Sequence, residues 1–204
     1  SVGGLVGVNA DGAEIREAKV EGEITGENMT GGLVGVNTEE AVVRNSIAES
    51  SIEAKERTGG LVGWNHGAAV VRNSTAQNNV NGEERVGGLV GENTGKGIVR
   101  NSTAENNIEG KKRVGGLVGL NEHGDIVQGS TVKSAVEGET RVGGLVGMNE
   151  TEGVLRDSSA ESYVHGDELV GGLVGINADE AVVQNSTAEG EVKLTQTIGA
   201  LIGK

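Results

Sequence analysis

The side chains of this chain that could bind a metal ion or transfer a proton are three histidines and 30 acidic residues. His66, His123 and His165 lie far apart in the sequence and do not show the close spacing of a metal-ligand set. The chain has no Cys, which excludes a disulfide, a thiolate metal site and a Cys nucleophile. We therefore expect no metal ion, no cofactor and no enzymatic activity.

Three further kinds of site use carboxylates or glycines. Paired carboxylates could act in polysaccharide cleavage, so a carbohydrate-active β-helix enzyme remains an alternative. The glycine-rich segments are not followed by Gly-Lys-Ser/Thr, as a phosphate-binding loop requires. They also lack the aspartate of calcium-binding nonapeptide repeats.

The glycines instead belong to a repeated motif, GGLVG, which returns at a constant interval and ends as GALIG. The copies begin at Gly3, Gly31, Gly59, Gly87, Gly115, Gly143, Gly171 and Gly199. A constant spacing over the whole chain predicts an array of seven equal units and a partial eighth.

Composition and charge restrict the partners of such an array. The chain has 37 Gly, one Trp, one Tyr and no Phe, which favours a thin interior of Val, Leu, Ile and Ala. The net charge of −13 disfavours nucleic acid and anionic membranes as partners. No apolar run approaches ~20 residues, so we expect no membrane insertion.

Within each unit the last segment alternates with period two, which is typical of a strand and not of a helix. In residues 74–82, for example, Ser74, Ala76, Asn78, Val80 and Gly82 share one side. One unit cannot bury this side alone, but stacked units can. Residues 1–204 are therefore predicted to form one all-β, parallel β-solenoid of 28-residue coils with right-handed winding.

Equivalent residues of successive coils form columns along this solenoid. The Leu of GGLVG is expected to face inward, and the Asn two residues after GGLVG is expected to form a hydrogen-bonded ladder. The ladder residues are Asn9, Asn37, Asn65, Asn93, Asn121, Asn149 and Asn177. The glycine columns are expected to permit positive φ or close backbone approach.

The Val beside each Leu is expected to point outward, because neighbouring residues of a regular strand face opposite sides. The column two residues later contains both Trp64 and Glu92, which also indicates an outward position. Together these columns predict an exposed apolar stripe that could be an interface. Its first column is Val6, Val34, Val62, Val90, Val118, Val146 and Val174. Its second column is Val8, Val36, Trp64, Glu92, Leu120, Met148 and Ile176. An irregular strand, or cover by another domain, is the alternative.

Two charged columns are expected on the surface. One alternates in sign from coil to coil and can help to fix the register; it consists of Glu27, Lys55, Glu83, Lys111 and Glu139. The other stacks like charges, with Glu56 and Glu84 in the column beside it; it consists of Arg57, Arg85, Arg113 and Arg141.

The pattern G-G-L-V-G-x-N, followed by a valine-rich strand, Asn-Ser-x-Ala and x-V-x-G, resembles the GLUG repeat over the whole chain. That family occurs in large bacterial surface and secreted proteins, including IgA-specific metallopeptidases and haemagglutinin-like adhesins. The resemblance implies an extracellular, non-catalytic repeat region. The peptidase activity of some relatives belongs to a separate zinc domain, and this chain has no HExxH motif.

These observations lead to the interpretation of a structural or adhesive repeat segment of a bacterial surface or secreted protein. It would act as a stiff spacer or as an extended face for a protein or glycan on a host or neighbouring cell. The alternative is a self-assembling filament subunit that binds other copies of itself, end to end or along the apolar stripe.

Overall fold

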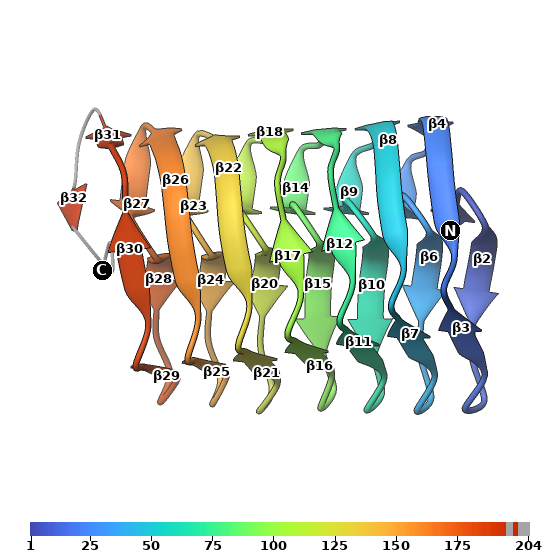
Figure 1. The fold of residues 1–204 in the computed structure, drawn as a ribbon. Helices are drawn as coiled ribbons and strands as arrows, with labels where there is room; N and C mark the ends of the chain where they lie inside the picture. The colour runs from blue at the N-terminus through green and yellow to red at the C-terminus, as the bar shows by residue number, and fades with distance from the viewer. Residues whose placement is uncertain (195–197, 200–204) are drawn as a thin grey trace.

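The computed structural model describes residues 1–194 and 198–199, and every regular element in these residues is a β-strand. The chain winds as a parallel β-solenoid of about seven coils, and its first coil, with β2 and β4, lies at the opposite end of the rod from the coil with β29 and β30 (Figure 1). The predicted all-β, parallel β-solenoid is therefore confirmed, and its right-handed winding stays a prediction. Of the predicted final GALIG copy, residues 200–203 lie outside the described part of the chain.

Each coil contributes to four parallel sheets, which we call A to D. Sheet A contains β1 (Val2–Gly3), β5 (Asn28–Gly31), β9 (Glu56–Gly59), β14 (Glu84–Gly87), β19 (Lys112–Gly115), β23 (Thr140–Gly143), β27 (Glu168–Gly171) and β32 (Ile198–Gly199). Sheet B contains β2 (Val6–Asn9), β6 (Val34–Asn37), β10 (Val62–His66), β15 (Val90–Thr94), β20 (Val118–Asn121), β24 (Val146–Asn149) and β28 (Val174–Asn177).

Sheets C and D form the remaining wall. Sheet C contains β3 (Glu14–Arg16), β7 (Val42–Arg44), β11 (Val70–Arg72), β16 (Ile98–Arg100), β21 (Ile126–Gln128), β25 (Val154–Arg156) and β29 (Val182–Gln184). Sheet D contains β4 (Lys19–Thr25), β8 (Ile47–Glu53), β12 (Thr75–Ala76), β13 (Asn79–Asn81), β17 (Thr103–Ala104), β18 (Asn107–Glu109), β22 (Thr131–Glu137), β26 (Ser159–Gly166), β30 (Thr187–Glu189) and β31 (Val192–Leu194).

The register follows the sequence repeat in all four sheets. Val62 pairs with Val90 in sheet B, and Thr75 pairs with Thr103 in sheet D, each exactly one repeat further along the chain. Because equivalent residues are neighbours in adjacent coils, each sequence column becomes a physical row along the rod.

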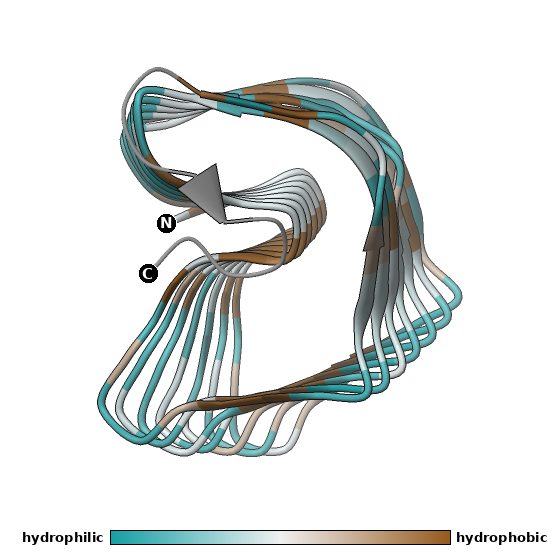
Figure 2. Ribbon diagram, turned by 90° about the vertical axis from the view of Figure 1, so that its left-hand side faces the viewer, coloured by the Kyte–Doolittle hydropathy of each residue, from teal (hydrophilic) through white to brown (hydrophobic). Residues whose placement is uncertain are grey.

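The cross-section is not a simple ring. Strands of sheets A and B fold back on each other as an arch, which projects into the space enclosed by sheets C and D (Figure 2). Two apolar clusters fill that space. The larger contains the Leu and Val of GGLVG with Val71 and its equivalents in sheet C, and the smaller contains Ile52 and Val86 with their equivalents in sheets D and A.

The glycines of GGLVG allow the two strands of the arch to touch. A Cβ atom built on Gly59 would lie 1.9 Å from the Val62 carbonyl oxygen, and one on Gly91 would lie 2.6 Å from the Arg57 carbonyl carbon. None of the GGLVG glycines described has a positive φ. Close backbone approach, and not positive φ, is therefore the reason for these columns.

The asparagine column forms the predicted ladder. The Nδ2 atom of Asn65 donates to Oδ1 of Asn93, 2.8 Å away in the next coil, and also to the Ala69 carbonyl oxygen at 2.9 Å. The same pair of bonds recurs from Asn9 to Asn149. The side chains satisfy buried backbone acceptors at the end of the loop that leads to sheet C, such as the Ala69 carbonyl oxygen directly before Val70.

Candidate functional site

The predicted exposed stripe is wrong, because both of its columns are covered in the interior coils. The Val residues of the first column are buried: Val34, Val62, Val90, Val118, Val146 and Val174. In the second column Val36, Glu92 and Leu120 are buried, while Trp64, Met148 and Ile176 are partly buried. Of the two columns only Val8, in the first coil, is exposed, at 54%, and Leu5 of the neighbouring Leu column is 52% exposed there as well.

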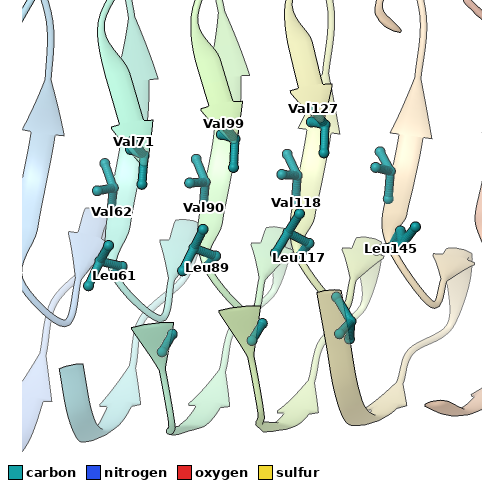
Figure 3. Packing of buried hydrophobic residues seen from close by; sticks show 14 of the residues in the cluster. Leu61, Val62, Val71, Leu89, Val90, Val99, Leu117, Val118, Val127 and Leu145 are labelled. Carbon is teal, nitrogen blue, oxygen red and sulfur yellow. The ribbon is translucent and has the colours of Figure 1, made fainter. Parts of the chain in front are cut away.

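The local geometry explains why Leu and Val both face inward. Strand β10 begins at Val62, so Leu61 lies in the bend between β9 and β10, where period-two alternation does not apply. Leu61 and Val62 both contact the larger cluster, and the same pair recurs at Leu89 and Val90 and again at Leu117 and Val118 (Figure 3). The irregular-strand alternative is therefore the correct one.

Side chains from sheet A contact Trp64 and Glu92 of the second column, and we call their own column the arginine column. It consists of Met29, Arg57, Arg85, Arg113, Arg141 and Leu169. All six have φ between 50° and 59°, a left-handed conformation that costs a non-glycine residue about 1–3 kcal/mol. This backbone kink places long side chains at the seam between sheets A and B, where a glycine would provide no cover.

In the third coil the only Trp of the chain, Trp64, contacts Arg57 and His66. The Arg57 guanidinium carbon lies 5.2 Å from the centroid of the Trp64 ring, within the range of a cation–π contact. The Trp64 and His66 rings are stacked with centroids 4.6 Å apart. Trp64 is therefore held by its neighbours and is not a free aromatic platform.

One coil further, Glu92 occupies the position of Trp64 and bridges two arginines. Its Oε2 atom lies 2.9 Å from Nε of Arg57, which donates a hydrogen bond to it, and 2.9 Å from Nε of Arg85, with which it forms an ion pair. The Glu92 side chain is only 6% exposed, so one buried carboxylate pairs with two guanidinium groups of adjacent coils and offsets half of their charge. The sequence interpretation missed this pairing of Glu92 with two arginines. The signal for it was that Glu92 is the single acidic residue in a column of apolar residues.

Outer carboxylates also contact the arginine column, as predicted. Glu56 lies within 3.9 Å of Arg57 and Arg85, and Glu84 lies within 3.9 Å of Arg85 and Arg113. These partly exposed pairs contribute little each, about 0–1 kcal/mol. Arg141 forms no ion pair in the described part of the chain.

The alternating charged column lies on the surface, as expected. Lys55 Nζ is 2.8 Å from Glu27 Oε1, and Lys111 Nζ is 3.2 Å from Glu83 Oε1. These side chains are all more than half exposed, so the pairs favour the register and add little stability.

Two acids near the asparagine ladder have unusual surroundings. Asp125 is fully buried in a column otherwise filled by Ala or Gly, and burial raises its pKa to about 8. Its Oδ1 accepts a hydrogen bond from the Gly97 amide at 2.8 Å, and its Oδ2 has no partner among the described residues. Burial, followed by repulsion from Glu122, raises the pKa of Glu150.

The outer face of sheet D carries shallow polar hollows. One of about 520 Å³ is lined by Glu53, Asn79, Asn107 and Glu137, among others. Its neighbour of about 720 Å³ extends toward Glu105 and Lys133. These open surfaces offer hydrogen-bonding groups without the enclosure of an active site.

The histidines remain apart in the folded chain. His66 stacks on Trp64, while His123 Nδ1 lies 3.3 Å from Thr94 Oγ1 and His165 is exposed on sheet D. In residues 1–194 and 198–199, no group of three or more His, Asp or Glu side chains could hold a metal ion. The same residues contain no helix with the length and apolarity needed to cross a membrane.

The geometry defines a class of protein: a parallel β-solenoid repeat segment, held together by stacked side-chain ladders and a glycine-lined arch. Comparison with known families finds the GLUG motif at residues 1–25, 56–81, 82–109 and 166–193, which together make up just over half of the chain. The chain belongs to the GLUG motif family. No curated protein and no solved structure gave a significant match.

Proposed function

We propose that this repeat segment is a non-catalytic stiff spacer or extended binding face in a bacterial cell-surface or secreted protein. The observation that carries the proposal is the unbroken register of all four sheets, in which strands pair with their equivalents one repeat away. Continuous backbone pairing and the asparagine ladder resist bending of the rod. The open polar face of sheet D supports the adhesive role.

A surface-display experiment tests both roles. The chain is placed between a cell-wall anchor and a reporter domain, and its coils are duplicated one complete repeat at a time. A spacer predicts that the reach of the reporter grows by about 4.8 Å per coil. An adhesive face predicts that cells that display the chain alone retain glycans or host cells. A reach independent of coil number, together with no retention, would contradict the proposal.

Self-assembly is the second candidate, and the side chains at the end of the first coil are the ones that a stacked copy would contact. Leu5 and Val8 are half exposed there, whereas their equivalents Leu33 and Val36 are buried beneath the adjoining coil. Another copy stacked on this end would bury them. Sedimentation of the chain over a range of concentrations, beside a Leu5→Lys, Val8→Lys variant, separates the possibilities. Assembly that the variant abolishes supports stacking, and a monomer at all concentrations excludes it.

A further inference from the structure

Arg113 and Arg141 occupy the same positions of the repeat as Arg57 and Arg85, but no carboxylate lies between their guanidinium groups in the described residues. Glu92 lies in strand β15 of sheet B, which directly follows the Arg85 strand β14 along the chain. Its carboxylate binds between Arg57 and Arg85. Met148 follows Arg113 and Arg141 at the same sequence spacing as Glu92 follows Arg57 and Arg85, so Met148 occupies the equivalent position. The structure thus contains one arginine pair with a carboxylate between its two members and one pair without such a carboxylate.

The surroundings of the second pair leave donors unused. The Nε atoms of Arg113 and Arg141 are buried and have no hydrogen-bond partner among the described residues. The Nε atom of Arg85 also donates no hydrogen bond there, but the Glu92 carboxylate lies beside it at 2.9 Å. A buried donor without a partner is destabilising, because it has lost its hydrogen bond to water and gained none in exchange. In the outer column, where Glu56 and Glu84 flank the earlier arginines, Lys112 and Thr140 stand instead.

The nearest carboxylates compensate this pair only in part. Glu84 Oε2 lies 3.9 Å from Nη1 of Arg113, but Glu84 also contacts Arg85 and Lys112. Glu150 is close enough for both arginines to lower its pKa, yet it forms no ion pair with either within the described residues. In the part of the chain that the structure describes, no carboxylate therefore pairs with the Arg141 guanidinium group.

We propose that Arg113 and Arg141 form a binding site for a carboxylate supplied by another molecule. The planar guanidinium group offers paired N–H donors that match a carboxylate. The Arg113 side chain is 23% exposed, so a ligand in solvent meets the outer N–H groups of its guanidinium group, while the Nε atom lies buried behind them. Glu92 provides the precedent within the same chain, because it shows that one carboxylate serves two arginines of adjacent coils.

The charge of the whole chain selects the kind of ligand. At −13 the rod repels polyanions, so an isolated carboxylate on an otherwise neutral molecule is the better occupant. If the adhesive role proposed above holds, that molecule is a glycan with a single acidic sugar. Only this biological source rests on the proposed function, since the carboxylate site itself can be tested alone.

Acetate is the simplest probe. In NMR spectra of the arginine Nε–Hε groups, sodium acetate is expected to shift the signals of Arg113 and Arg141 and to leave Arg57 and Arg85 unchanged. Sodium chloride at equal ionic strength provides the background. Equal responses of all four arginines, or none beyond the chloride background, would overturn the proposal.

Matched variants at one position provide the decisive comparison. Met148→Glu places an internal carboxylate between Arg113 and Arg141, so the acetate response should disappear. In Met148→Gln the new side chain has the shape of Glu without its charge, so this variant should retain the acetate response. Glu92→Gln should give Arg57 and Arg85 an acetate response that they lack in the natural chain. A response that persists in a folded Met148→Glu variant would refute the site.

A second ligand separates the site from its biological use. A neutral oligosaccharide that ends in one uronic acid is compared with the same oligosaccharide after reduction of the acid to an alcohol. Binding of the acid form alone supports both the site and the adhesive role. Acetate binding without oligosaccharide binding supports the site and counts against the adhesive role.

Discussion

At the scale of single residues, Asp125 has the environment that differs most from the repeat. Its equivalents in other coils are small, for example Ala41 and Ala69, and its carboxyl group is buried with one oxygen unpartnered among the described residues. Its raised pKa of about 8 means that the native state holds the proton over a range in which the unfolded chain has lost it.

This linkage predicts a pH-dependent free energy of unfolding. Between about pH 4 and pH 8 the native state binds more protons than the unfolded state, so stability falls as the pH rises. Asp125→Ala should remove this dependence and raise stability by several kcal/mol at pH 8, since one pKa unit corresponds to about 1.4 kcal/mol. Urea unfolding from pH 5 to pH 9 measures both effects. Glu109→Ala, which changes an exposed carboxylate, should leave the slope unaltered.

The asparagine ladder gives a second prediction at this scale. Asn93→Ala removes an acceptor for Asn65 and the donors to Asn121 and the Gly97 carbonyl oxygen. Because these partners are buried, the variant should lose about 1–3 kcal/mol of stability. Asn107→Ala, whose bond to Asn79 is exposed, should lose less than about 0.5 kcal/mol. Equal losses in chemical denaturation would show that burial does not govern the ladder.

At the scale of elements, the arch of sheets A and B depends on glycine. Gly91→Ala would place a methyl group 2.6 Å from the backbone of Arg57 and of Gly63, where neither atom can move freely. We expect a destabilisation of more than about 3 kcal/mol in thermal or urea unfolding. Gly7→Ala in the same column meets nothing closer than 3.8 Å and should change stability by less than about 1 kcal/mol.

The inward Val column gives another element-scale prediction. Val62→Lys places a charge inside the larger apolar cluster and should destabilise the fold by more than about 4 kcal/mol. Val8 lies on the exposed first coil, two residues after the equivalent of Val62. Val8→Lys should therefore change the free energy of unfolding little. Circular dichroism during urea unfolding measures the difference. Similar stability of the two variants would place Val62 on the surface after all.

At the scale of the whole molecule, the coils are interchangeable units. Deletion of residues 59–86 removes one complete coil and joins equivalent positions, so the pairing of all four sheets can re-form. The variant should remain folded and be about 4.8 Å shorter in small-angle scattering, with unfolding at lower urea because fewer coils are stacked. Loss of folded structure would mean that the coils are not equivalent.

Much of this molecule follows from its periodic sequence. The constant repeat spacing determined the coil, the parallel pairing and the register, because identical units bury their apolar sides best when they stack in phase. Period-two alternation correctly placed Ala76 and Val80 inside, and the asparagine column correctly predicted a ladder. These features depend on neighbours that are either adjacent in sequence or equivalent in the repeat.

The cover of the GGLVG strand, in contrast, depends on contacts made in three dimensions. Sheets A and B fold into an arch whose bend places Leu61 and Val62 on the same side, and Arg57 adopts a left-handed conformation that covers the next column. The local pattern could not show this, because the cover comes from another segment of the coil. For the same reason the arginine pair that lacks an internal carboxylate, Arg113 and Arg141, became visible only when Glu92 was seen between Arg57 and Arg85.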